Sequence, residues 1–235
     1  MVRETQKEMR RQRTLDAAEA LIRKTGTTEF SMQTLANKAK LSLATPYNLF
    51  GSKSAILYAL LNRSLDEIAE GAEKAFAHPH PVQRVLRAAA SSAAFFVSAP
   101  DFYRPLYRFL LGVGDTVHRP AYMERSLDYW KTALLGFVQQ DLLPKEAGCE
   151  HLARQLVIQF VGALDLWVQE ELDDIEFKAQ ISYGTGLLLL GVARIEDREL
   201  LLKHLGTLKR KLPRQSPFVR PPMTGNPPGP PSPGH

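Results

Sequence analysis

Residues 30–53 read FSMQTLANKAKLSLATPYNLFGSK, and this stretch decides the fold. Ser31 and Ser42 each stand before a short run of helix-forming residues, where a serine side chain can accept a backbone N–H and cap the helix. Only a short segment separates the two runs, so a tight turn fits between them. The pattern therefore predicts helices near residues 31–39 and 43–49, and two short helices joined by a tight turn form a helix-turn-helix.

The second of these helices is expected to have two different faces. Leu43, Tyr47 and Phe50 have the spacing of a partly buried face. The outward face that remains consists of Ala44, Thr45 and Asn48. In a helix-turn-helix the second helix lies in the major groove of DNA, and short side chains at its front allow it to approach base edges closely.

Charge is distributed unevenly along the chain. Residues 1–53 carry ten Lys and Arg against five Asp and Glu, whereas residues 54–202 carry 14 against 20. Residues 203–235 add six basic residues and no acidic ones. A basic head attracts a polyanion such as DNA, and an acidic body is repelled by it. At least one DNA contact is expected from the basic arm, and the alternative is that the arm is only a solvated helix face: Arg3, Lys7, Arg10, Arg11 and Arg13.

Helical periodicity runs along almost the whole chain, which predicts an all-α protein. The expected helices outside the helix-turn-helix lie near residues 4–24, 52–77, 82–98, 102–113, 121–142, 146–171, 175–195 and 197–212. Four prolines are expected at or near helix starts, where a missing N–H costs least: Pro100, Pro105, Pro120 and Pro144. Nine of the sixteen prolines lie from Pro213 onward, and no core can form there.

A longer pattern surrounds the quoted stretch. It comprises Arg13, Leu15, Ala17, Ala18, Leu21, Gly26, Ser31, Leu35, Ala36, Ala39, Leu41, Ser42, Thr45, Tyr47, Phe50, Ser52 and Lys53. Over about residues 10–60 this pattern resembles the N-terminal domain of the tetracycline-repressor (TetR) family, in its spacing as well as in its residues. The resemblance implies an all-helical fold, homodimerisation through the last two large helices, and a small-molecule pocket in the body.

The resemblance also assigns roles and boundaries. The expected DNA-binding residues are Ser42, Ala44, Thr45, Tyr47, Asn48 and Lys53. Thr45 and Asn48 would face bases or nearby phosphates, whereas Tyr47 and Lys53 would hold phosphates. Pro46 departs from the family, which has an aliphatic residue there, and it limits where the recognition helix can begin. The expected domains are an N-terminal three-helix DNA-binding domain over 1–52, a larger helical ligand-binding and dimerisation domain over 53–212, and a disordered tail over 213–235.

Aromatic residues gather in the body, and a ligand site is mostly apolar with a few placed polar groups. The expected ligand-binding residues are Phe96, Tyr103, Tyr107, Tyr122, Trp130 and Phe137. Candidates for the polar groups are Arg104, Arg108 and His118. The alternative is that these aromatic residues form the core and that the charged ones lie at the surface.

The helices near 146–171 and 175–195 each carry an apolar stripe. The first comprises Leu152, Leu156, Phe160, Ala163 and Trp167, and the second Phe177, Ile181, Gly184, Leu188 and Val192. An intramolecular core would explain both stripes. The family resemblance instead favours a four-helix dimer interface, in which Gly184 and Gly191 would allow the helices to approach closely.

No sequence signature of an enzyme is found. The histidines lack the His-x-x-x-His spacing of a metal site, and there is neither a glycine-rich phosphate loop nor a Gly-x-Ser-x-Gly elbow. We therefore expect no catalytic residue, no metal and no cofactor. Cys149 is the single cysteine, so no internal disulfide can form. The charged N-terminus is no secretory signal, and no apolar stretch reaches the ~20 residues that span a bilayer, so a cytoplasmic protein without membrane partners is expected.

Together these features predict a homodimeric DNA-binding transcriptional regulator. It would repress at palindromic operators in double-stranded DNA and be released by a small apolar or aromatic effector. The alternative is a helical interaction or scaffold protein that acts through its body or its proline-rich tail without specific DNA binding. A gel shift separates the two.

Overall fold

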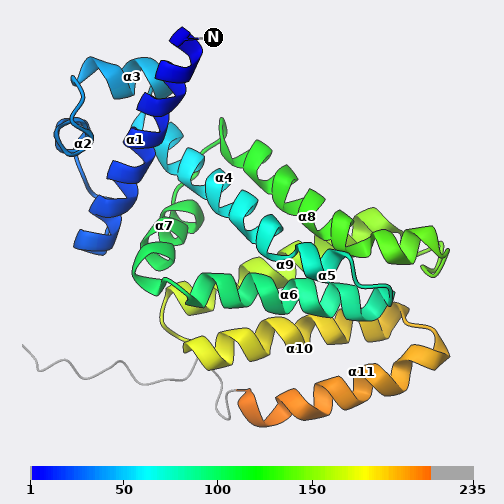
Figure 1. The fold of residues 1–235 in the computed structure, drawn as a ribbon. Coiled ribbons are helices and arrows are strands. Elements are labelled where there is room, and N and C mark those ends of the chain that lie inside the picture. Colours follow the sequence, from blue (N-terminus) through cyan, green and yellow to red (C-terminus); the bar gives the residue numbers. More distant parts are fainter. Residues whose placement is uncertain (1, 213–235) are drawn as a thin grey trace, which may run out of the picture.

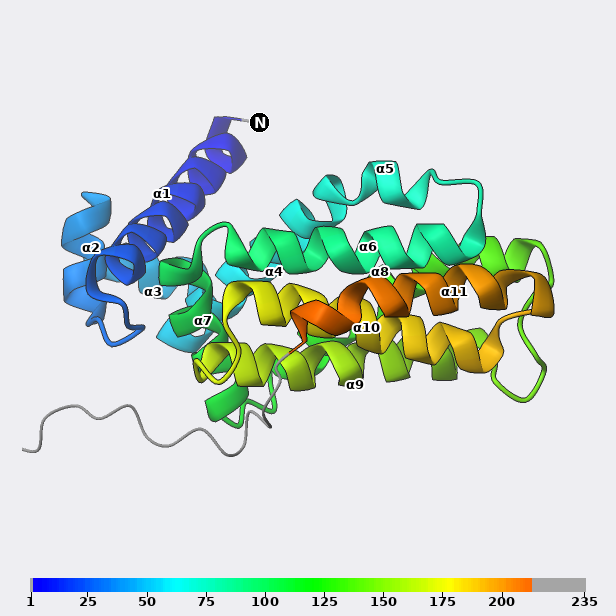
Figure 2. The same cartoon turned by 90° about the horizontal axis from the view of Figure 1, so that it is seen from below.

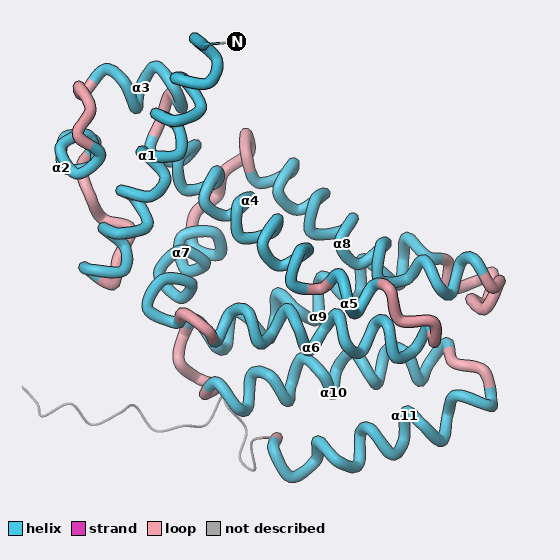
Figure 3. The backbone as a smooth tube through the Cα atoms, in the orientation of Figure 1, coloured by secondary structure: helices cyan, strands magenta, loops and turns pink. Residues whose placement is uncertain are grey.

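The computed structural model describes residues 2–212, and every regular element in that range is helical (Figures 1 and 3). In chain order the helices are α1 (Val2–Thr25), α2 (Met32–Ala39), α3 (Ala44–Phe50), α4 (Lys53–Gly71), α5 (Glu73–Phe76), α6 (Pro81–Val97), α7 (Pro100–Gly112), α8 (Arg119–Gln139), α9 (Cys149–Val168), α10 (Asp174–Val192), α11 (Ile195–Leu208) and the 3-10 turn η1 (Lys209–Lys211). The predicted all-α fold is confirmed. The predicted disordered tail over 213–235 lies outside the described residues.

The head of the molecule consists of α1, α2 and α3, which gather at one end (Figure 1). The hydroxyl of Ser31 accepts the amide N–H of Thr34 at 3.0 Å and caps α2, as its sequence position predicts. Lys40 adopts a left-handed conformation with φ of 54°, which ends α2 and makes the tight turn. The head buries a small core that includes Ala18, Ile22, Leu35 and Ala36.

The body consists of α4 to α11, and its long helices run side by side (Figure 2). Helix α6 packs between α8 and α10, α9 packs against both α8 and α10, and α11 covers part of α10. Aromatic rings fill the centre: Phe96 lies 4.7 Å from Tyr107 and 5.6 Å from Phe160, measured between ring centroids. Such edge-to-face and tilted pairs stabilise a core beyond the area that they bury.

The long helix expected over 52–77 is divided in two. Helix α4 ends at Gly71, a poor helix former, and α5 begins at Glu73. The hydroxyl of Ser91 on α6 donates to the carbonyl of Gly71 at 3.1 Å. Because that tertiary hydrogen bond satisfies a carbonyl at the helix end, the chain can turn there, and the sequence pattern alone does not reveal it.

Pro105 also differs from its expected place. It lies inside α7, which begins at Pro100, rather than at a helix start. A proline there removes the hydrogen bond to the carbonyl of Asp101. Asp101 is exposed, so water can bond to that carbonyl and the cost is tolerable.

Helix α4 connects the head with the body. Near its middle, Arg63 bonds Asp16 of α1 at 2.8 Å and also pairs with Glu19 of the same helix. On the other side, Arg125 of α8 pairs with Asp66 of α4 at 2.5 Å. Because α4 is tied to both parts, the predicted boundary between residues 52 and 53 remains a prediction.

Candidate functional site

The front of α3 presents short side chains to solvent. Ala44 and Asn48 are exposed, and Thr45 is half-buried. This agrees with the outward face that the sequence predicts. A helix with such a face can enter a groove of DNA without a bulky side chain between its backbone and the base edges.

The predicted inner face of α3 is wrong in part. Tyr47 keeps 47% of its surface exposed and Leu43 keeps 41%. The buried position is taken by Pro46, with Leu49 and Phe50 half-buried beside it. Proline has no N–H to satisfy, so it packs inward in the first turn without loss, and Tyr47 is turned outward.

Ser42 does not cap α3 in the expected way. Its Oγ lies 2.8 Å from Oγ1 of Thr45, a bond between two hydroxyls, and no side chain caps the helix at Leu43. The expected bond from its side chain to a backbone N–H is absent. The turn is held instead by the amide of Thr45, which donates to the carbonyl of Ser42 at 3.0 Å.

A basic groove lies beside the front of α3. Its lining comes from α1 and α3 and consists of Gln6, Lys7, Arg10, Thr45, Asn48 and Leu49. The charges of Lys7 and Arg10 thus lie next to the short polar side chains of the recognition helix. Cationic side chains at the border of a base-reading surface are placed to hold backbone phosphates.

Two other arginines of the basic arm serve the fold. Arg13 donates to the carbonyl of Ala39 at 2.6 Å and to that of Lys40 at 3.0 Å, so it binds the C-terminal end of α2. The guanidinium of Arg11 lies 4.3 Å from the ring centre of Phe50. The arm is therefore divided between residues that hold the head together and residues that line the basic groove.

Lys53 is partly engaged within the head. Its Nζ lies 3.6 Å from a carboxylate oxygen of Glu29 and 5.1 Å from the ring centre of Phe30. Glu29 is largely exposed, so this ion pair is weak and screened by salt. Lys53 can exchange Glu29 for a phosphate at small cost.

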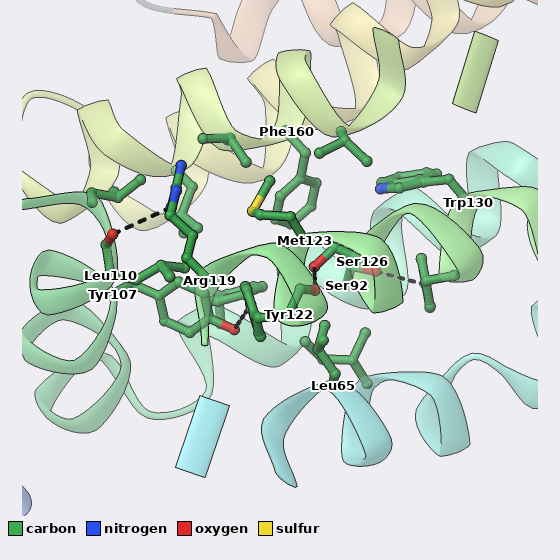
Figure 4. Close-up of a pocket in the computed structure, with 17 residues that line it drawn as sticks. Leu65, Ser92, Tyr107, Leu110, Arg119, Tyr122, Met123, Ser126, Trp130 and Phe160 are labelled. Atoms are coloured by element: carbon green, nitrogen blue, oxygen red, sulfur yellow. Dashed lines mark hydrogen bonds between the residues drawn. The ribbon is translucent and has the colours of Figure 1, made fainter. Parts of the chain in front are cut away.

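The body encloses a cavity of about 60 Å³ between α4, α6, α7, α8 and α9 (Figure 4). Its lining is Leu65, Ile68, Ser92, Phe96, Tyr107, Leu110, Leu111, Arg119, Tyr122, Met123, Ser126, Tyr129, Trp130, Val157, Phe160, Val161 and Leu164. Most of these side chains are aliphatic or aromatic. An apolar hollow with a few polar groups is the usual form of a small-molecule site.

The hydroxyl groups of the cavity bond to one another. The Tyr107 and Tyr122 hydroxyls lie 2.9 Å apart, and the Ser92 hydroxyl donates to that of Tyr129 at 2.6 Å. Burial raises the pKa of Tyr107 well above its ordinary value and that of Tyr122 to about 12. These phenols are therefore neutral hydrogen-bonding groups rather than charged ones.

The sequence profile of the tetR family of bacterial regulatory proteins matches residues 15–60. This match begins within α1, contains α2 and α3, and ends within α4, so it covers the whole helix-turn-helix. Residues 15–60 therefore match the DNA-binding domain of the TetR family. No curated protein matches the chain by sequence at a significant level.

Solved structures of TetR-family proteins share the fold. SmeT, the repressor of the Stenotrophomonas maltophilia multidrug efflux pump SmeDEF, is 22% identical with a TM-score of 0.59, over 79% of this chain and 91% of that one. Thermus thermophilus FadR, a TetR-family transcriptional repressor solved with lauroyl-CoA, is 23% identical with a TM-score of 0.66, over 78% and 95%. A gamma-butyrolactone receptor (ArpA-like protein) is 18% identical with a TM-score of 0.55, over 88% and 99%.

Four of the six expected ligand residues line the cavity: Phe96, Tyr107, Tyr122 and Trp130. The other two lie elsewhere. Tyr103 packs 4.9 Å from Phe95 between ring centroids, and Phe137 is buried in the core. The three expected polar groups also lie outside the cavity lining. They have other partners: Arg104 pairs with Asp174, Arg108 donates to the carbonyl of Val168, and His118 bonds Asp115.

Several residues of α8 that were not expected from the sequence also line the cavity. With Tyr122 and Trp130 they form one helical face, at spacings of three and four: Arg119, Met123, Ser126 and Tyr129. That periodicity is the signal that could have found them. Arg119 was overlooked because a charged residue in a helix is normally a surface residue.

The two apolar stripes expected at the dimer interface belong to the interior. Trp167, Phe177 and Ile181 are fully buried, and a side chain at Gly184 would meet Gln159 of the same chain. The stripes therefore hold α9 and α10 to their own body. A different face of these helices is open: Ile158 is 56% exposed and Leu187 is 47% exposed.

Residues 2–212 contain neither a cluster of metal-ligating side chains nor a membrane-spanning helix. No group of three or more His, Cys, Asp or Glu side chains is arranged there to hold a metal ion. None of the described helices is both long enough and apolar enough to cross a membrane.

Proposed function

We propose that this TetR-family regulator is a homodimeric repressor that binds palindromic DNA through α3 and releases it when a small molecule enters the body cavity. The observation that carries the proposal is the exposed front of α3 beside the basic groove of Lys7 and Arg10. The relatives SmeT and FadR are described as repressors, which favours repression over activation. Such a protein acts on DNA in the cytoplasm and is a regulator rather than an enzyme.

The proposed DNA contacts fall into two groups. Base edges are read by Ala44, Thr45 and Asn48, where an Asn amide can bond adenine twice and a small side chain can contact a thymine methyl group. Phosphates are held by Ser42, Tyr47 and Lys53 together with the groove residues Lys7 and Arg10. The phosphate contacts give affinity and register, and the base contacts give sequence preference.

The size of the cavity suggests how a ligand acts. A volume of about 60 Å³ is small beside the roughly 300–1,000 Å³ of ordinary ligand pockets. A ligand must therefore widen the cavity as it enters. Leu65 and Ile68 of α4 form part of the wall, so widening displaces α4.

Displacement of α4 moves the head, because Arg63 ties the two through Asp16 and Glu19 of α1. The two heads of a dimer must fit successive major grooves, about 34–36 Å apart along B-DNA. A ligand that prefers the widened body shifts the population away from this spacing and lowers the affinity for DNA.

Dimerisation is proposed through the open face of α9 and α10. Ile158 and Leu187 are apolar and exposed on it, and a side chain added at Gly162 or Gly191 would meet open space. Two copies of this face would form a four-helix interface. The glycines allow the backbones of the two protomers to approach closely.

Selection of bound duplexes from random DNA by the full chain tests the function. We expect enrichment of one palindromic site with two half-sites about one helical turn apart. Asn48→Ala should change the enriched sequence, whereas Lys74→Gln, a surface change on α5, should not. Recovery of no preferred sequence would favour the alternative, a helical interaction protein without specific DNA binding.

A further inference from the structure

The cavity contains one charged side chain, and the protein does not neutralise it. Arg119 is the only ionised group among the lining residues. Its guanidinium donates a long hydrogen bond of 3.4 Å to the carbonyl of Leu110. No carboxylate in residues 2–212 lies within ion-pairing distance of it.

Other arginines of the same region have shorter hydrogen bonds or a carboxylate partner. Arg104 pairs with Asp174 at 3.3 Å, Arg108 donates to the carbonyl of Val168 at 2.7 Å, and Arg125 pairs with Asp66 at 2.5 Å. Arg119 is thus the arginine of this group that lines the cavity, and its one hydrogen bond, to a backbone carbonyl, is the longest of the four. A half-buried cation of this kind is stabilised when an anion comes to it.

A second polar group lies at the same end of the cavity. The hydrogen bond between the Tyr107 and Tyr122 hydroxyls uses only one of their two protons. The remaining O–H can donate to a ligand oxygen. Because burial raises the pKa of both phenols, they stay protonated and keep this donor at neutral pH.

The rest of the cavity is mostly apolar, and its other hydroxyl groups, those of Ser92, Ser126 and Tyr129, donate hydrogen bonds within the protein. Figure 4 shows Arg119 and Tyr107 towards one end, Trp130 at the other, and Met123 and Phe160 between them. The charged group of the lining therefore lies at one end of the hollow, and most of the remaining lining is aliphatic or aromatic. Because the cavity has a volume of only about 60 Å³ and must widen for a ligand, a slender chain requires less widening than a fused ring system.

We propose that the effector is an amphiphilic anion, with a carboxylate bound by Arg119 and the Tyr107–Tyr122 pair and an unbranched apolar chain that extends towards Trp130. A planar guanidinium matches a carboxylate with two parallel hydrogen bonds. The proposal rests on the proposed function, since it names the ligand class of the same cavity. It replaces the purely apolar effector that the sequence suggests.

Ligand binding to the full chain, without DNA, tests the proposal through tryptophan fluorescence. Trp130 lines the cavity, whereas Trp167, the second of the two tryptophans, is fully buried against Phe177. The probes are decanoate, decanol and decyltrimethylammonium, which share a chain and differ in head-group charge. We expect saturable quenching, with decanoate bound about tenfold or more tighter than decanol, and decyltrimethylammonium weakest.

Variants of Arg119 isolate the role of the charge. Arg119→Gln should lower the affinity for decanoate about tenfold and leave the affinity for decanol unchanged. The affinity of Arg119→Lys for decanoate should lie between those of Arg119→Gln and the wild type. Lys131→Gln is the matched control, because it removes a positive charge from α8 outside the cavity lining. It should leave all three affinities unchanged.

Equal affinities for decanoate and decanol, no saturable quenching by decanoate, or decanoate binding unaffected by Arg119→Gln would each overturn the proposal. Release of the selected duplex is measured separately. Release of the duplex by decanol but not by decanoate would overturn the proposal that the effector is an anion. It would still agree with the proposed function, a repressor that a ligand releases from DNA. Tight decanoate binding with no release of DNA would support the site and contradict the proposed function.

Discussion

The hydroxyl of Ser54 donates a hydrogen bond of 2.5 Å to the carboxylate of Asp115. Ser54 lies in the first turn of α4, next to the head, and Asp115 lies in the loop that leads to the start of α8. The amide of His118 also donates to Asp115, at 2.6 Å, and Arg119 of the cavity follows directly. The polar end of the cavity is thus connected to the beginning of α4 through a single carboxylate.

Loss of this connection should weaken ligand response more than DNA binding. In Ser54→Ala the carboxylate keeps its bonds from the loop, so the fold should persist while α4 is no longer held to the loop. We expect wild-type affinity for the selected duplex and a smaller drop in that affinity on addition of decanoate, measured by fluorescence anisotropy. Ser91→Ala, which removes the bond to Gly71 at the far end of α4, is the control. Full ligand response in Ser54→Ala would rule out this route.

Asp115 should also make stability depend on pH. Hydrogen bonds from the His118 amide and the Ser54 hydroxyl hold the pKa of Asp115 well below its usual range. A lowered carboxyl pKa stabilises the folded state above the ordinary value of 3.8, and this stabilisation is lost as the pH falls below it. Melting temperatures should therefore fall less between neutral and acid pH in Asp115→Asn than in the wild type. If the melting temperatures of the two proteins fell in parallel with pH, Asp115 would not be a source of the pH dependence.

The two proposed groups of DNA contacts should respond differently to mutation. Lys7→Gln and Lys53→Gln each remove a phosphate partner, so they should weaken binding to all sequences and reduce the salt slope by about one. Asn48→Ala should leave the salt slope unchanged and relax preference at one base pair by about 1–3 kcal/mol. Titrations at several salt concentrations, on matched and mismatched duplexes, separate the two effects. An unchanged salt slope in Lys53→Gln would show that Lys53 holds no phosphate and that it stays paired with Glu29.

The two faces of α9 and α10 should be separable. Leu187→Glu and Ile158→Glu place charge on the open face, so they should give folded monomers in sedimentation with weak DNA binding. Gly184→Leu instead crowds Gln159 within the chain and should lower the melting temperature. Dimers that persist in both charged variants would place the interface elsewhere.

The head was the part most accessible from sequence, because its signals are local. The cap at Ser31 and the turn at Lys40 depend on residues close in the chain, and the structure has both as expected. The orientation of Tyr47 depends instead on how Pro46 packs against the rest of the head, which no local pattern encodes.

The body was harder to predict. An apolar stripe on a helix has the same periodicity whether it packs against its own chain or against a second protomer. The stripe that contains Leu156 and Trp167 has the periodicity of an interface, yet its partners lie in the same chain. Tyr122 and Trp130 could be predicted as cavity residues because a group of large aromatic residues in the sequence is typical of an apolar ligand site. Arg119 was missed because a charged residue in a helix normally lies at the surface, and only the fold shows that this one lines the cavity.

The most direct test of the account is the ratio of affinities of the full chain for its selected palindromic duplex and for a scrambled duplex, at one physiological salt concentration. Base reading by α3 in a dimer predicts a ratio of about a thousand or more. The same ratio should fall by roughly tenfold or more in Asn48→Ala, in line with the loss of a base contact. Equal affinity of the wild type for both duplexes would contradict the account, because the exposed front of α3 would then read no sequence.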